Sequence, residues 1–423
     1  MDILSLLSLK REDFKTAPFC RETEKEFIIY LELKIPTIRR CPYCKSNKVH
    51  IKDIKYECIK HQCSTLTEKT IVLIITKRRF KCKNCGKTYI QNSEIVEKNC
   101  RISNPIRWAI VKELKDFVSF SYVARKFKVN NQTVMNIFDE MIRVGRSAMP
   151  TCLCIDEKRF TTDEGKYICI IGNARTSEVV DVIKTRKKAY LNEYFSKIPE
   201  IERENTKFFF SDMYEGYRLI KRKFFKNAIH IVDHFHIKRL FTDVLQKIRI
   251  EYMNKLDNKS KEYKFLKNNW RYFLVNPYSE KAEKMAIVDK KTGIIYGVKE
   301  LVYYAIRNSC PLLLEIHNIY SDVCEYLTPE YTRNELENSL DFIINRCLSS
   351  TSKHINKLGS TLLNFYSEIL AFFDNENQYR LSNASAESIN SSIDELISVS
   401  HGLRDYYLFR KRVLYILKER GTK

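Results

Sequence analysis

Two cysteine pairs constrain the first hundred residues of this chain more than any other feature. Each pair has the spacing C-x-x-C, and the first pair begins at Cys41 and the second at Cys82. A C-x-x-C turn is tight enough for both of its sulfurs to reach one metal ion, and two such turns give the tetrahedral thiolate site that zinc prefers. The spacing therefore predicts one structural Zn²⁺ with four ligands: Cys41, Cys44, Cys82 and Cys85.

The gap between the two pairs is longer than in the shortest zinc ribbons, so it must contain folded structure of its own. The apolar run 71–75 and the residues Arg79 and Phe80 indicate β-strands there. The alternative is that the pairs are unrelated free thiols in a chain with 14 cysteines. Three further residues could supply alternative ligands or a second site, but their spacing is looser and we interpret them as bystanders: Cys58, His61 and Cys63.

The charge of the chain indicates a polyanionic partner. Its 423 residues carry 74 Lys and Arg against 52 Asp and Glu, a formal net charge of +22. The excess is concentrated near the N-terminus, since residues 1–150 hold 30 of the basic and 16 of the acidic residues. Such a charge attracts nucleic acid or an anionic membrane surface. The most apolar run, 71–75, is far shorter than the roughly 20 residues of a membrane-spanning helix, so we expect nucleic acid and no membrane.

Other sequence features exclude further classes of protein. The chain has only 10 glycines and contains neither a G-x-G-x-x-G nor a G-x-x-x-x-G-K-[ST] motif, which disfavours dinucleotide enzymes and P-loop NTPases. Residues 1–5 lack the basic region and the cleavage site of a signal peptide. We therefore expect an intracellular protein whose cysteines are thiols or metal ligands rather than disulfides.

Residues 119–140 have the pattern of a helix-turn-helix. Apolar residues recur at helical spacing on both sides of a turn near Val129. The second helix would begin with three polar side chains that can reach base edges in a DNA groove. The alternative is a plain structural pair of helices, which is a common motif. The candidate DNA-binding residues are Asn131, Gln132 and Thr133.

From about residue 151 to 240 the chain alternates between strand and helix patterns. Three strand-like runs come before any helix, and helix, strand, helix and strand follow. This order predicts a mixed sheet whose first three strands form a meander and whose later strands are joined by crossover helices. Residues from about 236 to 380 read as almost wholly helical. The strand-like runs are 152–155, 167–171, 179–183, 208–210 and 228–232, and the helix-like stretches are 189–198 and 214–225.

Carboxylates follow two of these strand-like runs. Asp156 comes directly after the first run and Asp212 shortly after the fourth, and these strands can be neighbours in such a sheet. A third acid, Glu387, lies at the start of a helix that carries Asn390 on the same face. Oxygen ligands with open positions suit hard divalent cations, although any one of these acids alone would be read as a solvated charge. Glu157 would point to the opposite face of its strand from Asp156, so we interpret it as structural.

Several segments in a fixed order together match one known family, and their combination is far more specific than any one of them. The segments are Cys154-Ile155-Asp156-Glu157 with Gly165-Lys166-Tyr167, then Ser211-Asp212-Met213-Tyr214-Glu215-Gly216-Tyr217, then Ile231-Val232-Asp233-His234-Phe235-His236, and finally Ser382-Asn383 with Ala386-Glu387-Ser388-Ile389-Asn390 and His401-Gly402-Leu403. On these segments the chain resembles, over nearly its whole length, a DDE transposase of the ISL-three insertion-sequence family.

This resemblance implies a fold and a catalytic site. The fold would be multidomain α+β: an N-terminal four-cysteine zinc finger and a helix-turn-helix, then an α/β ribonuclease-H-like mixed sheet interrupted by an all-helical insertion. The catalytic triad would be Asp156, Asp212 and Glu387. Two Mg²⁺ (or Mn²⁺) ions per active site would activate water or a DNA 3′-hydroxyl and stabilise the leaving oxygen. Supporting residues would be Asp233, Asn390 and His236, the last with an ordinary core histidine as its alternative.

The function that the resemblance implies is that of a DNA transposase in the cytoplasm of a prokaryotic cell, associated with the nucleoid. It would bind terminal inverted repeats and catalyse metal-dependent DNA cleavage and strand transfer by a DDE two-metal mechanism. Its partners would be double-stranded DNA, as repeats and as target, and a second copy in a homodimer on paired ends. Alternatives are a transposase-derived DNA-binding regulator without cleavage activity, and a metal-dependent nuclease or RNA-processing enzyme on the same fold. The expected domains are 1–100 (zinc-finger DNA-binding domain), 101–150 (helix-turn-helix), 151–240 with 381–423 (catalytic domain) and 241–380 (helical insertion).

Overall fold

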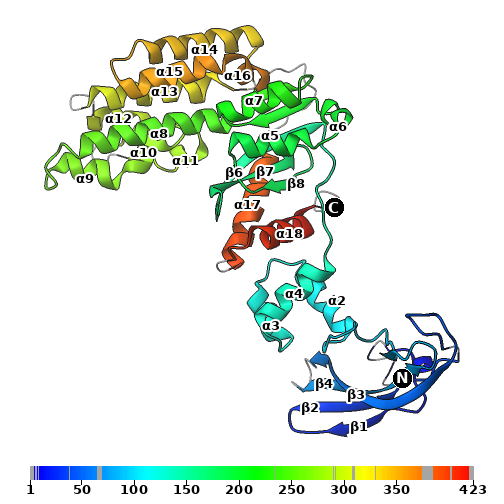
Figure 1. Cartoon of the computed structure of the whole chain (residues 1–423). Helices are drawn as coiled ribbons and strands as arrows, with labels where there is room; N and C mark the ends of the chain where they lie inside the picture. Colours follow the sequence, from blue (N-terminus) through cyan, green and yellow to red (C-terminus); the bar gives the residue numbers. More distant parts are fainter. Residues whose placement is uncertain are drawn as a thin grey trace. The chain divides into compact units, whose positions relative to one another are not determined.

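The computed structural model contains two compact units, whose elements are labelled in Figure 1. The first unit consists of Met1–Val144 with Ile393–Ile416, and the second of Gly145–Ser392 with Leu417–Lys423. The structure describes residues 4, 7, 9–37, 39–63, 69–232, 234–288, 290, 292–306, 310–328, 330–373, 384–400 and 403–418. Side chains are described for all of these except residues 62, 63, 234, 305 and 384–387.

The first unit begins with a five-stranded sheet. Its strand order is β1-β2-β4-β3, and the short β5 pairs with one end of β4. β2 and β4 run parallel, whereas the other neighbours are antiparallel. Strands therefore fill the gap between the two cysteine pairs, as predicted. The elements are η1 (Arg11–Asp13), β1 (Phe19–Glu22), β2 (Glu26–Glu32), β3 (Val49–Cys63), β4 (Thr70–Cys82) and β5 (Thr88–Ile90).

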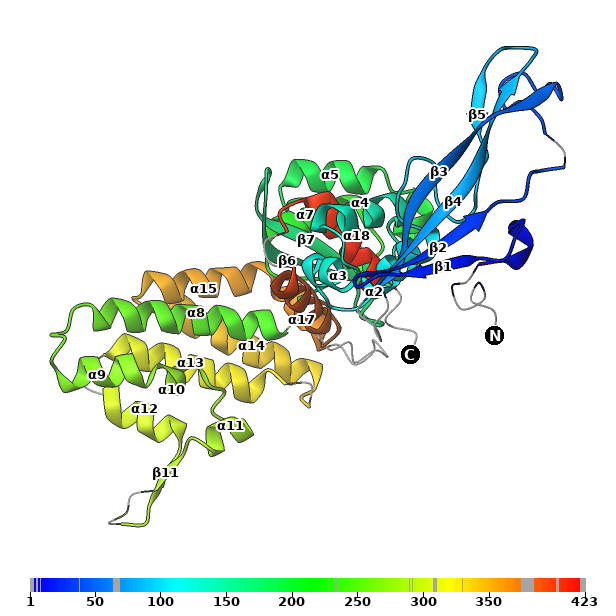
Figure 2. The ribbon, with the colours of Figure 1, turned by 90° about the horizontal axis from the view of Figure 1, so that it is seen from below.

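Strands β3 and β4 form a long antiparallel ribbon (Figure 2). β4 is rich in β-branched residues, which fit the pleated surface of a sheet. Its alternate residues Leu73 and Ile75 are buried in a core shared with β2. Register shifts at Ile51/Asp53 and Lys60/Gln62 interrupt the pairing, and such bulges increase the twist of a ribbon.

A group of helices follows this sheet in the first unit. The helix pair predicted over 119–140 is present, with four residues between α3 and α4. Side-chain caps fix both helix starts: the Ser119 hydroxyl accepts from the Tyr122 amide at 3.0 Å, and the Asn130 side chain accepts from the Thr133 amide at 2.7 Å. The helices are α2 (Asn104–Glu113), α3 (Phe120–Lys126), α4 (Asn131–Met141) and, from the other end of the chain, α18 (Tyr406–Leu417).

Helix α18 packs on this group through a buried arginine. The Arg412 guanidinium lies over the Phe120 ring at 4.9 Å and donates to the backbone carbonyls of Asp116 and Val118 at 3.1 and 2.7 Å. Leu408 of α18 belongs to the same apolar core as α2, α3 and α4. The expected domain division placed residues 381–423 with the catalytic sheet, whereas the contacts place 393–416 in the first unit.

The second unit contains the mixed sheet predicted from the sequence. Its strand order is β10-β9-β6-β7-β8. The first three strands in the chain form an antiparallel meander, and β9 and β10 continue the sheet in parallel with β6. The elements are β6 (Cys152–Thr162), β7 (Gly165–Asn173), β8 (Val179–Ile183), α5 (Lys188–Ser196), α6 (Glu200–Glu204), β9 (Phe208–Ser211), α7 (Glu215–Phe224) and β10 (Ile229–Val232).

Helices cover one face of this sheet because alternate strand residues are apolar. Leu153 and Ile155 of β6 share a buried core with Phe195 of α5 and Tyr217 of α7. The residues between them, such as Cys154, therefore belong to the opposite face. That face is approached by α17 (Ala384–Val399) at residues that lie in the second unit.

The stretch after β10 is almost wholly helical, as predicted, with one small two-stranded hairpin. Helices α8, α13, α14 and α15 lie side by side around a common apolar core (Figures 1 and 2). Among the described residues, no helix combines the length and the apolarity needed to cross a membrane. The elements are α8 (His234–Met253), α9 (Lys261–Asn268), α10 (Trp270–Leu274), α11 (Glu280–Glu283), β11 (Ile287–Val288), β12 (Ile295–Tyr296), α12 (Val298–Ile306), α13 (Pro311–Tyr326), α14 (Arg333–Leu348), α15 (Lys353–Asn364) and α16 (Tyr366–Phe372).

The close approach of α17 to the sheet at Gly172 generates a test. A Cβ at this position would lie 2.5 Å from Ile389 Cδ1 and 3.0 Å from Cys154 Sγ. We expect Gly172→Ala to lower the free energy of unfolding by about 1–3 kcal/mol, because overpacking displaces neighbours. Ile389→Val in the Gly172→Ala background removes Cδ1 and should recover part of this loss. Urea unfolding of the two variants and the Ile389→Val single variant measures the coupling, and strictly additive effects would contradict the contact.

Candidate metal centre and acidic site

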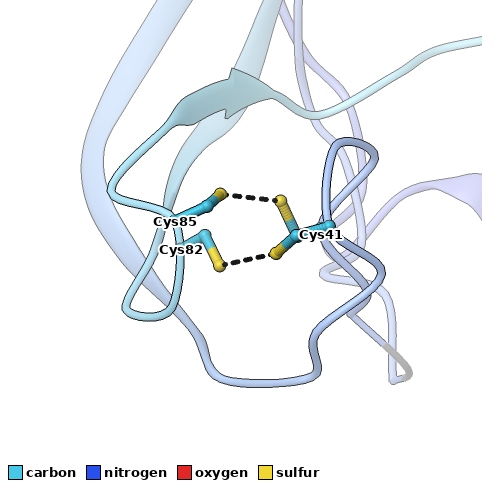
Figure 3. Close-up of side chains that lie close together, drawn as sticks. Cys41, Cys82 and Cys85 are labelled. Carbon is cyan, nitrogen blue, oxygen red and sulfur yellow. Dashed lines mark hydrogen bonds between the residues drawn. The ribbon is translucent and has the colours of Figure 1, made fainter.

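The four cysteines predicted to bind zinc lie together at one end of the β3–β4 ribbon. Their sulfurs all lie within 4.8 Å of one another, and the distances between Cys41 and Cys85 and between Cys44 and Cys82 are both 3.6 Å (Figure 3). A tetrahedral zinc site with Zn–S bonds of about 2.3 Å has sulfurs about 3.8 Å apart. The geometry of this cluster therefore fits one zinc ion.

The two cysteine turns have the same backbone structure. The amide of Lys45 donates to the Cys41 carbonyl at 2.9 Å, and the amide of Gly86 donates to the Cys82 carbonyl at 3.0 Å. Lys45 and Gly86 both have positive φ angles, 59° and 70°, a left-handed conformation that favours glycine. The repeated turn aims the two sulfurs of each pair in one direction.

The electrostatics of the cluster also favour a cation. A hydrogen bond from the backbone at Ser46 lowers the pKa of the Cys44 thiol to about 6. For Cys85, a backbone hydrogen bond at Lys87 is outweighed by burial and by the neighbouring thiols, which raise its pKa to about 11. Four thiolates cannot coexist this closely without a positive charge between them. A divalent metal would supply that charge.

Of the looser candidates, Cys58 and His61 do not join this cluster. His61 is buried, and its two ring nitrogens lie 2.9 Å from the Ser103 hydroxyl and 2.9 Å from the Leu7 carbonyl. Cys58 is exposed, and the side chain of Cys63 lies outside the described residues. His61 has thus a structural role in linking the sheet to the segment around Ser103.

The predicted DNA-binding residues lie at the start of α4. Asn131 and Gln132 are exposed and Thr133 is half-buried. The Thr133 hydroxyl donates to the Asn130 side chain at 2.6 Å, and the Gln132 amide donates to Asn136 at 2.8 Å. Thr133 therefore takes part in the helix cap, whereas Asn131 and Gln132 present polar groups to solvent. Their role in DNA binding stays a prediction.

Asp156 lies within β6, which continues to Thr162 beyond the predicted run 152–155, whereas Asp212 directly follows β9, the neighbouring parallel strand. In the pairing of β6 with β9, Cys154 lies opposite Phe210, so each aspartate lies two residues beyond this pair. Residues at corresponding positions on neighbouring strands share a face and lie about 5 Å apart along the sheet. The two carboxylates therefore belong to one end of one face, as the sequence predicted for the first and fourth strands.

Helix α17 contacts Asp156 on the sheet face opposite α5 and α7. The Asn390 side chain donates a hydrogen bond to the Asp156 carboxylate. The amide oxygen of Asn390 is buried and has no hydrogen-bond partner in the described part of the chain. Glu387 precedes Asn390 by three residues in α17 and so lies on the same helix face one turn away; its side chain is outside the described residues.

The surroundings of Asp212 disfavour its ionised form. Burial, together with the nearby carboxylates of Glu157 and Asp156, raises the pKa of Asp212 to about 7. The same repulsion would be relieved by a divalent cation, which stabilises the ionised carboxylates. The unpartnered Asn390 oxygen and the charged carboxylates are the hard ligands that such a cation prefers.

Glu157 points away from Asp156, as expected, but it is part of the electrostatics of the site. It forms an ion pair with Arg186 at 2.5 Å and accepts a hydrogen bond from the Tyr217 hydroxyl at 3.2 Å. The Arg186 guanidinium also lies 5.2 and 5.3 Å from the Tyr167 and Tyr214 rings. Sequence spacing gave no sign of Arg186, because the pair joins β6 to a loop 29 residues later.

A second feature that sequence reasoning missed is a buried network of polar side chains that begins at Ser211, next to Asp212. The Ser211 hydroxyl donates to the Asp212 carbonyl at 2.8 Å and contacts His230 Nε2 at 2.8 Å. His230 Nδ1 lies 3.7 Å from the Glu368 carboxylate, which accepts two hydrogen bonds from Arg218 at 2.7 and 2.9 Å. This polar network connects the end of β9 to α16. No local motif could reveal it, since Arg218 and Glu368 are 150 residues apart.

The supporting residues expected near this site have different outcomes. Asn390 is in contact with Asp156, as described above for α17. His236 is half-buried in α8, with its ring 5.8 Å from that of Phe235 in an edge-on arrangement. Asp233 lies outside the described residues. The roles of Asp233 and His236 stay predictions.

Comparison with known families agrees with this geometry. The family model of the ISL-three DDE transposases, described as a transposase, matches residues 153–413. The match spans the mixed sheet, the helical stretch and α17. A search of curated proteins found no match.

The cysteine cluster generates a prediction about metal content. We expect the purified chain to contain about one zinc per molecule, and Cys82→Ser to lose it, because three thiolates leave the tetrahedral site open. Cys58→Ser is the matched control, since Cys58 is exposed and outside the cluster. Elemental analysis after gel filtration measures the ratio. Equal zinc content in the Cys82→Ser and wild-type proteins would contradict the four-cysteine site.

The buried polar network at Glu368 generates a prediction about stability. Burial alone would raise the pKa of Glu368, but the nearby His230 ring and the Arg218 hydrogen bonds outweigh it and lower the pKa to about 2. Because the pKa is depressed from its usual 4.5, the ionised carboxylate stabilises the fold above about pH 4.5, and this contribution is lost as pH falls toward 2. We expect Glu368→Gln to cost about 3 kcal/mol at pH 7.

The matched control for this prediction is Asp322, which pairs with Arg346 in the same unit. Burial raises the pKa of Asp322 instead of lowering it, so Asp322→Asn should cost less than Glu368→Gln at pH 7. Urea unfolding at pH 7 and pH 4 measures both. A Glu368→Gln loss that is no larger than that of Asp322→Asn, or that is unchanged at pH 4, would contradict the role of the ionised carboxylate.

Proposed function

The chain belongs to the ISL-three family of DDE transposases, and we propose that it is a DNA transposase that binds terminal inverted repeats and catalyses metal-dependent DNA cleavage and strand transfer. The substrate would be double-stranded DNA, both as the ends of the element and as the target. Two copies would act together on paired ends. The reaction is phosphoryl transfer, in which a DNA phosphodiester is cut and rejoined.

The observation that carries this proposal is the common position of Asp156 and Asp212. Continuing the β6–β9 register gives the two aspartates corresponding positions, and the Asn390 hydrogen bond to Asp156 holds α17, the helix that carries Glu387, against β6. These three acids come from parts of the chain up to 231 residues apart. A sheet order of β10-β9-β6-β7-β8 supports a ribonuclease-H-like catalytic domain around them, with the helical stretch as an insertion.

Asp156, Asp212 and Glu387 are the residues that would hold two Mg²⁺ or Mn²⁺ ions. Bound there, the metals would supply the positive charge that activates water or a DNA 3′-hydroxyl and stabilises the leaving oxygen. The raised pKa of Asp212 and the unpartnered Asn390 oxygen support a cation at this place.

The remaining contacts of the site orient these carboxylates. Asn390 donates to one oxygen of Asp156, and the backbone amide of Glu157 donates to the other at 2.7 Å. The backbone amide of Tyr214 donates to Asp212 at 3.1 Å. Each aspartate is therefore held in a fixed direction by groups of the chain itself, which reduces the reorganisation needed on binding a metal.

The N-terminal parts would recognise the ends of the element. The four-cysteine cluster would be a structural zinc finger, and α3 with α4 would act as a helix-turn-helix whose residues Asn131, Gln132 and Thr133 face the DNA. The exposed side chains of Asn131 and Gln132 support this role. The proposed domains are 1–100, 101–150, 151–240 with 381–423, and 241–380. Residues 393–416, which include the end of α17 and most of α18, have their contacts in the first unit instead.

Replacement of one metal ligand tests the function. We expect Asp212→Asn to reduce cleavage by about 100-fold or more while DNA binding persists, because the amide removes one charge from the cation site. The substrate is a short duplex of the repeats that flank the coding sequence, incubated with and without Mg²⁺ and analysed for nicks at nucleotide resolution. Asp163→Asn is the control, since Asp163 lies in the β6–β7 turn and pairs with Lys184.

Each outcome of this experiment has a distinct meaning. Cleavage by the wild type and by Asp163→Asn, but not by Asp212→Asn, supports the proposed transposase. Binding without cleavage by the wild type in both Mg²⁺ and Mn²⁺ would favour a DNA-binding regulator instead. Cleavage by Asp212→Asn at the wild-type rate would contradict the proposed triad.

A further inference from the structure

The β3–β4 ribbon has an unusual charge distribution at the end that carries the cysteine cluster. Residues 39–60 and 77–87 contain thirteen Lys and Arg but only two acids, Asp53 and Glu57. Both acids are neutralised within the ribbon. Asp53 accepts two hydrogen bonds from Arg79, at 2.6 and 2.9 Å, and Glu57 pairs with Lys77. The remaining basic side chains of the ribbon are therefore not balanced by these acids.

Three of these lysines lie along the edge of the sheet. Lys48 precedes β3, and Lys52 and Lys55 belong to it; all three are exposed. β3 is the last strand in the sheet order, and among the described residues its outer side meets only a single bridge, at Lys60. At about 3.3 Å per residue the three lysines span about 23 Å, which is the rise of about seven base pairs of duplex DNA.

Apolar side chains are interleaved with these lysines. Ile51, Ile54 and Tyr56 are 39%, 47% and 72% exposed. Their cross-strand partners Phe80, Arg78 and Thr76 are alternate residues of β4, so the three apolar side chains share one face of the ribbon. The bulge at Lys52 keeps Ile51 on this face. Lys55 lies opposite Lys77 and therefore belongs to the other face of the ribbon, so the apolar stripe and this lysine flank the same free edge of β3.

Two kinds of occupant could cover this surface, and its charge decides between them. A second copy pairing edge to edge through β3 would place lysines near lysines, and like charges on neighbouring strands are destabilising. Duplex DNA presents one negative charge per about 1.7 Å of its axis, and apolar side chains of a β-ribbon can lie against the walls of a groove. The charge of this edge is complementary to DNA.

We propose that the edge formed by Lys48, Lys52 and Lys55, with the stripe Ile51, Ile54 and Tyr56, is a docking surface for duplex DNA that is separate from helix α4. This inference deepens the proposed function by naming where the backbone of the DNA is held. Lysine contacts to phosphates carry no sequence information, so this surface binds any duplex. Helix α4 would then supply base readout on DNA that the ribbon already holds.

A binding measurement tests the surface. Fluorescence anisotropy measures the affinity of the full chain for a 30-base-pair duplex of arbitrary sequence, at several salt concentrations and without Mg²⁺. The variant Lys48→Ala/Lys52→Ala/Lys55→Ala should bind about tenfold more weakly, and the slope of log K against log salt should fall by about 2–3, one per lost phosphate contact. The control Lys261→Ala/Lys264→Ala/Lys267→Ala removes the same charge from exposed positions of α9 and should leave the slope unchanged.

Tyr56→Ala provides a second measurement. It should weaken binding without changing the salt slope, because it removes a groove contact and no charge. Unchanged zinc content in these variants establishes that the ribbon is folded, which is expected because all four positions are exposed and the Arg79–Asp53 pair remains.

Several results would overturn this surface. They are equal losses in the two triple variants, a wild type that binds no duplex, and a dimer that Tyr56→Ala converts to monomer without a change in DNA affinity. A wild type that binds DNA through these lysines but never cuts it supports the surface and removes only the proposed cleavage, since no metal or cleavage enters the measurement.

Discussion

The parallel pairing of β6 with β9 is the interaction on which the acidic site depends. A shift of one residue in this register would move Asp212 out of line with Asp156 and turn its side chain to the opposite face. The register is fixed by the burial of alternate residues, since Leu153 and Phe209 lie opposite each other in the core under α5 and α7. The hydrophobic core on one face thus sets the position of the carboxylates on the other.

The charge that this register gathers is balanced by contacts from distant parts of the chain. Arg186 neutralises Glu157 on the α7 side of β6, and Asn390 donates to Asp156 on the α17 side. Burial and the carboxylates of Glu157 and Asp156 raise the pKa of Asp212, and the hydrogen bond from the Tyr214 backbone amide offsets only part of this effect.

The sequence predicted the elements whose signals are local and missed those whose signals are not. Runs such as 208–210 are apolar enough to be found as strands, and the C-x-x-C spacing alone predicted the cluster that brings Cys41 and Cys85 together. By contrast, the packing of α18 on α3 depends on Arg412, whose partners lie about 295 residues earlier. A buried arginine has no pattern that distinguishes it from a surface arginine before the fold is known.

The cysteine cluster and the charge of the ribbon are physically linked. Strands β3 and β4 carry seven Lys and Arg, and the flanking residues 39–48 and 83–87 carry six more. Because these charges repel one another, the ribbon needs contacts that oppose separation of its strands. Cys82 ends β4 opposite Val49, the first residue of β3, and a metal bound there would join the ends of both strands. The Asp53–Arg79 ion pair also joins β3 to β4, three residues further along β4. Positive charge that is costly for folding is thereby kept in an exposed row, where an anionic partner can neutralise it.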